Sequence, residues 1–129
     1  YPLGVTYNET VRAVEEVLES NIIDAFPGKK KGIFCLSDTS AIIVLNYLFR
    51  KYGCLPDDYR IIGFDDTPPS REAVLPLSTI GQQTDVLVDT AMTMLTQQIR
   101  SYKGNHTGTP EKPVHAVIPP HLINRRTTD

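Results

Sequence analysis

The sequence has no apolar run that approaches the roughly 20 residues needed to cross a membrane as a helix. Its first residues, Tyr-Pro-Leu-Gly, contain no methionine, no basic region and no apolar core of the kind a signal peptide needs. We therefore expect neither membrane association nor a secretory leader in this stretch. We also expect these 129 residues to be a piece of a longer protein.

Cysteine is also scarce, since Cys35 and Cys54 are the only two. They form no C-x-x-C motif, and the three histidines, His106, His115 and His121, show no metal-ligand spacing. We interpret the cysteines as reduced thiols of a cytoplasmic protein, with a disulfide or a metal site as the alternative. No cofactor is expected.

An excess of positive charge is missing as well. Thirteen Lys and Arg residues stand against 15 Asp and Glu, which leaves a net charge of −2. Because a free-standing DNA-binding domain usually has a basic face, we do not expect this stretch alone to bind DNA. The 40% hydrophobic and 22% charged content is typical of a globular chain, and the length suits one domain with a real core.

The first elements are predicted by local patterns. The capping-box pattern Thr6-x-x-Glu9 precedes apolar residues at helical spacing and predicts a helix over about 7–20. The short apolar run 32–36 is typical of a strand that is buried on both faces.

A second helix is predicted over about 38–53, because a wide apolar stripe ends there at Gly53, a usual place for glycine after a helix. The apolar residues 61–64 then indicate a strand. A strand, a helix and a strand with short connections form a parallel, right-handed βαβ unit.

The second half of the chain continues this alternation. We predict a short helix over about 70–74, a strand over 77–81, a long amphipathic helix over about 83–103, a strand over 114–118 and a further strand piece at 122–123. The expected fold class is therefore α/β, with a three-layer arrangement of helices around a parallel sheet.

Two adjacent acids end the strand 61–64, and the prolines 68–69 follow them. Ligands of open α/β sheets bind in the crevice at the carboxyl ends of the strands, so Asp65 is a candidate acceptor for a hydroxyl or amino group. If the strand continued, Asp66 would point to the other face, and we expect it to hold the proline-containing loop in place.

The paired acids do not indicate a glycosidase, since adjacent strand residues point to opposite faces and would not flank one bond. The sequence also contains no nucleophile elbow, zinc-protease motif or phosphate-cradling loop. We expect no enzymatic activity.

The ordered set of motifs resembles the effector-binding domain of the LacI/GalR family of bacterial transcription regulators, over nearly the whole chain. The pieces that carry the resemblance are the polar pair after the strand at 36–38, the helix closed by Gly53, Pro-Asp-Asp at 56–58, Gly-Phe-Asp-Asp at 63–66, Pro-Leu-Ser-Thr-Ile-x-Gln at 76–82, Pro-Pro-x-Leu-Ile at 119–123 and Arg-Thr at 126–127.

The resemblance implies a periplasmic-binding-protein-like fold in which two α/β lobes clasp a small ligand. Residues 1–82 would form most of the C-terminal lobe, and residues 83–129 would form a hinge-crossing helix and terminal strands. The lobe would be incomplete, so this stretch would supply about half of a pocket.

The resemblance also implies a set of site residues. Asp65 matches an aspartate that accepts hydrogen bonds from effector hydroxyl or amino groups, and Ser37 stands where the family usually has a ligand-contacting asparagine. Asp38 matches an aspartate that caps the following helix and borders the site. Gln82 lies at the hinge, where the family's glutamine is either structural or near the ligand.

The implied function is effector sensing and dimerisation in a transcription regulator. The effector would be a small molecule, a sugar or sugar derivative, and operator DNA would be bound only through an N-terminal segment outside these residues. A homodimer, or a swapped arrangement in which the long helix packs on its own sheet or on a neighbour's, is expected because the apolar stripe of that helix needs a partner. The alternatives are a periplasmic sugar-binding protein of a transport system and a regulator with a winged-helix DNA-binding segment.

Overall fold

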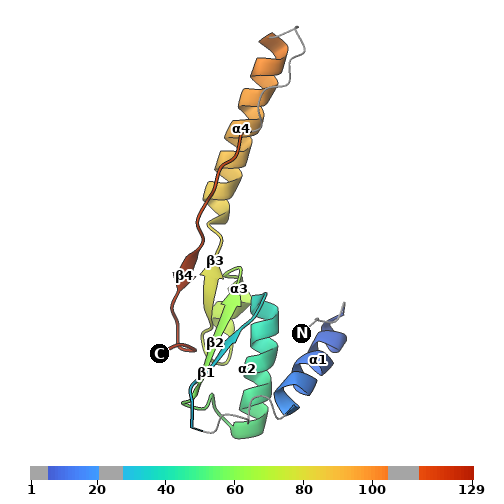
Figure 1. The fold of residues 1–129 in the computed structure, drawn as a ribbon, viewed down its shortest axis with the longest axis vertical. Helices are drawn as coiled ribbons and strands as arrows, with labels where there is room; N and C mark the ends of the chain where they lie inside the picture. The colour runs from blue at the N-terminus through green and yellow to red at the C-terminus, as the bar shows by residue number, and fades with distance from the viewer. Residues whose placement is uncertain (1–5, 21–27, 105–113) are drawn as a thin grey trace. The chain divides into compact units, whose positions relative to one another are not determined.

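The computed structural model describes residues 6–20, 28–104 and 114–129 of the chain. The chain divides into two compact units (Figure 1). The first, Tyr1–Gly81 with Leu122–Asp129, is called the sheet unit below, and the second, Gln82–His121, is called the helix unit. The sheet unit is therefore built from two stretches of sequence that lie far apart along the chain.

A four-stranded sheet organises the sheet unit. β1 pairs with β2 in parallel, with Ile33 opposite Ile61, and β2 pairs with β3 in parallel, with Gly63 opposite Thr79. The predicted α/β class and parallel pairing are thus confirmed. The strands are β1 (Lys31–Phe34), β2 (Tyr59–Phe64), β3 (Ser78–Gly81) and β4 (His121–Ile123), in the order β1-β2-β3-β4.

The helices of the sheet unit begin and end where local sequence signals place them. The capping box between Thr6 and Glu9 is present at the start of α1, and Gly53 ends α2 in the left-handed conformation. Pro68 and Pro69 open α3, where a missing amide proton costs little. The three helices are α1 (Tyr7–Glu19), α2 (Asp38–Tyr52) and α3 (Pro68–Glu72).

The core of the sheet unit lies between α2 and the sheet. Leu45 and Leu48 of α2 are almost fully buried, as are Ile61 of β2 and Leu77 before β3. α2 packs on β2 and also contacts α1 and α3, so it is the central helix of this unit (Figure 1). Burying these large side chains removes apolar surface from water and stabilises the unit.

The prediction that β1 is buried on both faces was wrong. β1 ends at Phe34 instead of residue 36, its residues alternate between partial burial and exposure, and Phe34 is 60% exposed. β1 is an edge strand of the described sheet, with Ile33 on one face packed against the core and Phe34 exposed on the other. An apolar run alone does not show how many faces are covered.

The helix unit consists of α4 (Thr84–Gly104) and an extended segment, 114–120. Gln83 Nε2 donates to the carbonyl oxygen of Pro119 at 2.6 Å. The predicted strand 114–118 is absent, because a strand needs a neighbour to pair with, and the described part of this unit offers none. The strand piece predicted at 122–123 is present as β4 of the sheet unit.

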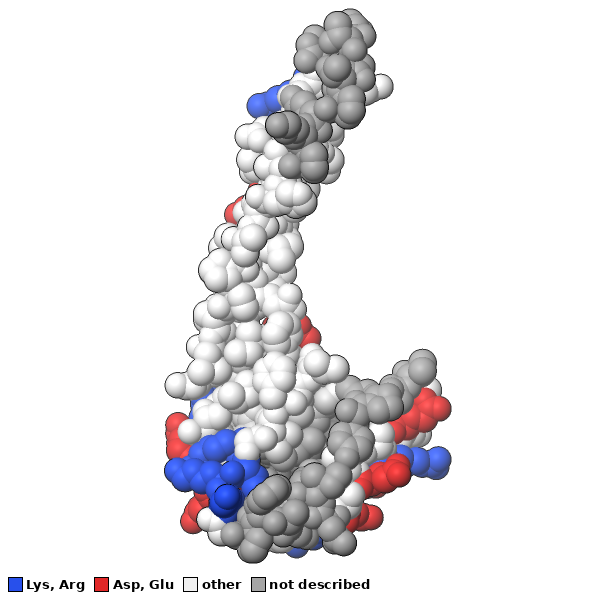
Figure 2. All heavy atoms as spheres, viewed as in Figure 1, with Lys and Arg blue, Asp and Glu red and all other residues white. Residues whose placement is uncertain are grey.

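The predicted apolar stripe of α4 is present on the helix, but its side chains remain about half exposed. Uncharged side chains cover most of α4 on the face in Figure 2. No helix of the described residues is long and apolar enough to cross a membrane. The half-exposed apolar side chains are Val86, Leu87, Val88, Met92, Leu95 and Ile99.

Candidate functional site

The carboxyl ends of β1 and β2 bring together four of the residues singled out in the sequence. Ser37 and Asp38 follow β1, and Asp65 and Asp66 follow β2. Because β1 and β2 are parallel neighbours, their carboxyl ends lie at the same edge of the sheet. This is the edge where open α/β sheets bind ligands.

Asp38 is fully buried and accepts three hydrogen bonds through its carboxylate. Its Oδ2 accepts from the backbone N–H of Thr67 at 2.7 Å and from Thr67 Oγ1 at 2.9 Å, and its Oδ1 accepts from Thr79 Oγ1 at 2.5 Å. These bonds connect the start of α2 with β3 and with the residue that precedes α3. The buried Asp38 therefore links α2, β3 and the residue before α3 at the carboxyl edge of the sheet.

The helix cap is Ser37, not Asp38. Ser37 Oγ accepts from the backbone N–H of Ser40 at 3.2 Å, which satisfies one of the unpaired amides at the start of α2. The prediction that Asp38 caps this helix was wrong, because its carboxylate is taken up by Thr67 and Thr79. Serine and aspartate are both common N-cap residues, so the sequence alone does not show which of Ser37 and Asp38 caps the helix.

Asp65 and Asp66 form a left-handed turn. Their φ angles are +103° and +52°, in a region that side-chain-bearing residues rarely adopt. The Asp65 N–H donates to Ile80 O at 2.9 Å, and the Asp66 N–H donates to Thr79 Oγ1 at 3.4 Å. The turn lifts Asp65 out of the strand and leaves it exposed at the edge of the sheet.

Asp66 is held by two arginines. Arg125 Nη2 contacts Asp66 Oδ1 at 2.5 Å, and Arg71 Nη2 contacts Asp66 Oδ2 at 2.7 Å. Burial alone would raise the pKa of Asp66, but the hydrogen bonds and charges of Arg125 and Arg71 outweigh it and hold the pKa below its usual range. The pair with Arg71 ties the turn to α3, so the predicted structural role of Asp66 is confirmed.

The segment 125–128 is built into the sheet unit at the amino end of β3 and beside β2. Thr127 Oγ1 accepts from the Ser78 N–H at 2.9 Å and donates to Ile61 O at 2.7 Å, and it is fully buried. Arg125 Nη1 donates to Leu77 O at 2.8 Å. Arg126 and Thr127 of this segment were singled out in the sequence, whereas Arg125 was missed. Two consecutive arginines, Arg125 and Arg126, precede Thr127, and the sequence alone did not show which of them is buried.

Gln82 is the first residue of the helix unit and is exposed. It follows Gly81, the last residue of β3, so it stands where the chain passes from one unit to the other. As a ligand contact, Gln82 stays a prediction.

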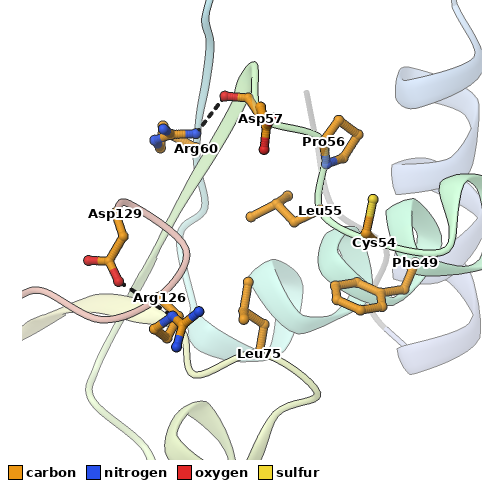
Figure 3. Close-up of a pocket in the computed structure, with 9 residues that line it drawn as sticks. All are labelled: Phe49, Cys54, Leu55, Pro56, Asp57, Arg60, Leu75, Arg126 and Asp129. Carbon is orange, nitrogen blue, oxygen red and sulfur yellow. Dashed lines mark hydrogen bonds and ion pairs between the residues drawn. The ribbon is translucent and has the colours of Figure 1, made fainter.

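A pocket of about 440 Å³ lies elsewhere in the sheet unit, around the amino end of β2 (Figure 3). Leu55, Leu75 and Phe49 point into it, and Arg126 lies at its border, paired with Asp129 at 3.5 Å. None of the residues at the carboxyl ends of the strands lines this pocket. The pocket and the predicted ligand site are therefore separate features.

The described residues offer little to a metal ion. No group of three His, Cys, Asp or Glu side chains gathers among residues 6–20, 28–104 and 114–129. Cys35 and Cys54 are both free thiols.

In open α/β sheets such as this one, ligands bind at the carboxyl ends of the strands. The family model for a periplasmic binding protein-like domain matches residues 2–128, and the chain belongs to this family.

The relatives are helix-turn-helix (HTH) type transcriptional regulators. CelR of Thermobifida fusca is 26% identical over 95% of this chain and 32% of its own length. PurR of Actinobacillus pleuropneumoniae is 35% identical over 74% of this chain and 27% of its own length. The resemblance to LacI/GalR-type regulators is confirmed, and the chain spans about a quarter to a third of the length of these relatives.

The fold has close counterparts among solved structures. The structure of a CelR–cellobiose complex superposes with a TM-score of 0.74 over 97% of this chain and 34% of the other, at 22% identity. This likeness confirms the predicted periplasmic-binding-protein-like fold.

Proposed function

We propose that this chain is part of the effector-binding domain of an HTH-type transcription regulator. The supporting observation is the left-handed turn that presents Asp65 at the carboxyl edge of a parallel sheet, in a chain whose relatives are such regulators. The sheet unit would be the C-terminal lobe and the helix unit the hinge-crossing part. Sensing, not catalysis, is the role proposed.

The proposed effector is a small polyhydroxylated molecule, with a sugar as the leading class. Asp65 would accept hydrogen bonds from its hydroxyl groups, with Ser37 and Gln82 at the border of the site. Asp38 would position the site from beneath, since its carboxylate is buried and already holds Thr67 and Thr79. The CelR structure with cellobiose supports this ligand class for a protein of the same fold.

The proposed mechanism is a shift in the arrangement of the two lobes. An effector that binds one arrangement more tightly than the other shifts the protein toward it, and the DNA-binding segments would change their spacing as a result. We place DNA contact outside these residues, since their net charge is −2. Regulators act on DNA, so a cytoplasmic location is proposed, and a transport role is not favoured by these relatives.

The test is a ligand screen on the full-length protein. Thermal shift in the presence of a panel of mono- and disaccharides that includes cellobiose should raise the melting temperature for at least one sugar. The same sugar should change the affinity of the protein for its operator DNA. A protein that binds no sugar of the panel, or binds one without any change at the operator, would contradict the proposal.

A further inference from the structure

The turn that carries Asp65 needs to be held in place. Asp65 and Asp66 are consecutive residues with positive φ, and neither is a glycine. Such conformations cost free energy and persist only when the surroundings impose them. Something around the turn must therefore provide the compensating contacts.

Three backbone hydrogen bonds hold the turn to the sheet unit, and the longest of them, at 3.4 Å, runs from the Asp66 N–H to Thr79 Oγ1. The Asp65 N–H donates to Ile80 O in β3, and the Thr67 N–H donates to the buried carboxylate of Asp38. These bonds fix the two ends of the turn. The side chain of the middle residue, Asp66, is held separately, by Arg71 and Arg125.

The two arginines differ in how firmly they are fixed. The Arg71 side chain is 62% exposed, whereas that of Arg125 is 15% exposed. Arg125 also donates through Nη1 to Ser70 Oγ at 3.1 Å and to Leu77 O at 2.8 Å, and its own N–H donates to Ser78 Oγ at 2.8 Å. The guanidinium thus has three partners, Asp66, Ser70 and Leu77, which keep it in position, so Arg125 is the rigid partner.

We infer that Arg125 is a positioning residue for the proposed effector site, which it serves by clamping Asp66 and thereby holding Asp65 in the left-handed turn. Arg125 lies two residues beyond β4 (His121–Ile123), on the stretch by which the chain returns to the sheet unit. The clamp therefore ties the returning chain to the turn that carries Asp65. A displacement of the segment that carries Arg125 would therefore also displace the turn.

The first test needs no effector and uses hydrogen exchange of backbone amides, followed by NMR, in the full-length protein. Arg125→Met should lower the protection of the Asp65 and Thr67 amides at least tenfold and change that of Leu45, in the core helix α2, less than threefold. Arg71→Met is the matched control and should change both sites less than threefold. Arg125→Lys keeps the positive charge but lacks the planar guanidinium with its several donors, so it should give an intermediate loss of protection at the turn.

Two results would overturn the clamp. One is unchanged protection of the turn in Arg125→Met, and the other is an equal loss at the turn and at Leu45, which would reveal a purely structural role. If Arg125→Met does not fold, Asp66→Asn replaces it, because it removes the charge on the other side of the same pair. The same two outcomes then decide.

The link to effector binding rests on the proposed function and is tested separately by calorimetric titration with cellobiose. Arg125→Met should weaken cellobiose binding at least tenfold, and Arg71→Met less than threefold. If the wild-type protein binds another sugar of the panel instead, that sugar replaces cellobiose in the titration. A wild-type protein that binds no sugar of the panel would count against the proposed ligand class, while the exchange experiment would still decide the clamp. Unaltered cellobiose binding in Arg125→Met would refute the positioning role.

Discussion

The backbone of Gly63 in β2 lies directly against the buried carboxylate of Asp38. A Cβ atom at this position would overlap Asp38 Oδ1 and would lie 3.0 Å from Leu77 Cδ2 and 3.2 Å from Asp38 Cα. These neighbours cannot move away easily, since Asp38 is held by Thr67 and Thr79 and Leu77 is fully buried. Glycine is therefore required here by close approach, with no special φ involved.

Gly63→Ala should destabilise the sheet unit by about 1–3 kcal/mol, the usual cost of overpacking. Gly32→Ala is the matched control, because nothing lies within 4 Å of a Cβ there, and it should change the stability by less than about 0.5 kcal/mol. Urea denaturation of the three proteins measures both effects. Equal losses in the two variants would show that the contact with Asp38 is unimportant.

Asp66→Asn should destabilise the protein by roughly 2 kcal/mol at pH 7, because it removes a charged partner of Arg71 and Arg125. The pKa of Asp66 is held below its usual range in the folded protein, so its charge contributes stability above the unfolded pKa of about 3.9. This contribution is lost as the pH falls through the folded pKa. The difference between wild type and variant should therefore shrink below about pH 4.

Denaturation curves of both proteins at pH 7, 5 and 3 check this expectation. The charged groups that face Asp66 are Arg71 of α3 and Arg125 after β4, and both stay protonated over this range. A difference that stays constant from pH 7 to pH 3 would contradict the assignment.

The sequence predicted the α/β class because periodicity and caps reflect local physics. Thr6 begins its helix with a capping hydrogen bond, and Gly53 ends its helix in the left-handed conformation. Both effects depend on residue type and local spacing, so the sequence alone predicts them. Local patterns could not decide whether residues 114–118 form a strand, since an apolar stretch becomes a strand only beside a partner strand. The same limit applies to β1, where Phe34 is exposed because one face has no cover.

The candidate site was predictable only in part. Asp65 stands out because it ends a buried strand, and its position at the carboxyl edge of the sheet follows from parallel pairing. Its left-handed turn and the role of Arg125 could not be predicted, because the contact between Asp66 and Arg125 spans 59 residues of chain. Contacts of that length depend on the folded sheet.

Asp65→Ala in the full-length protein should weaken the response to the effector by at least tenfold, about 1.4 kcal/mol, the scale of one charge-assisted hydrogen bond. An operator–reporter assay across the saccharide panel measures this response. Asp57→Ala is a suitable control, since Asp57 is an exposed acid near the amino end of β2, away from the proposed site. An unchanged response in Asp65→Ala would remove this residue from the site.

The two thiols should differ sharply in reactivity. Cys54 is exposed, whereas Cys35 is buried, and burial raises the pKa of the Cys35 thiol to about 11. At pH 8 iodoacetamide should modify Cys54 about 100-fold faster or more, because the thiolate is the reactive form. Mass spectrometry of tryptic peptides follows each thiol separately. Similar rates in the native protein would contradict the burial of Cys35.

The apolar stripe on α4 should drive association of the 129-residue chain. Val88, Met92, Leu95 and Ile99 lie on one side of the helix, and each is about half exposed. Light scattering at tens of micromolar should therefore show a dimer or a larger species, with two-fold pairing expected. Leu95→Glu should shift the chain toward monomer, and Thr93→Glu, on the opposite side of α4, should not. A wild-type monomer would refute this expectation.

The bonds of Thr127 also govern when the sheet unit can be completed. The Ile61 N–H donates to Thr127 O, and Thr127 Oγ1 donates to Ile61 O. Two polar groups of β2 are therefore satisfied by a residue 66 positions further along the chain. During synthesis the ribosome releases β1, β2 and β3 well before this residue. Contacts between residues so far apart in sequence require closure of a long loop, which costs entropy and slows folding. Until this loop closes, the N–H and carbonyl groups of Ile61 lack Thr127 as a partner. Because Thr127 is made after the three strands, its contacts with β2 and β3 can form only after those strands exist.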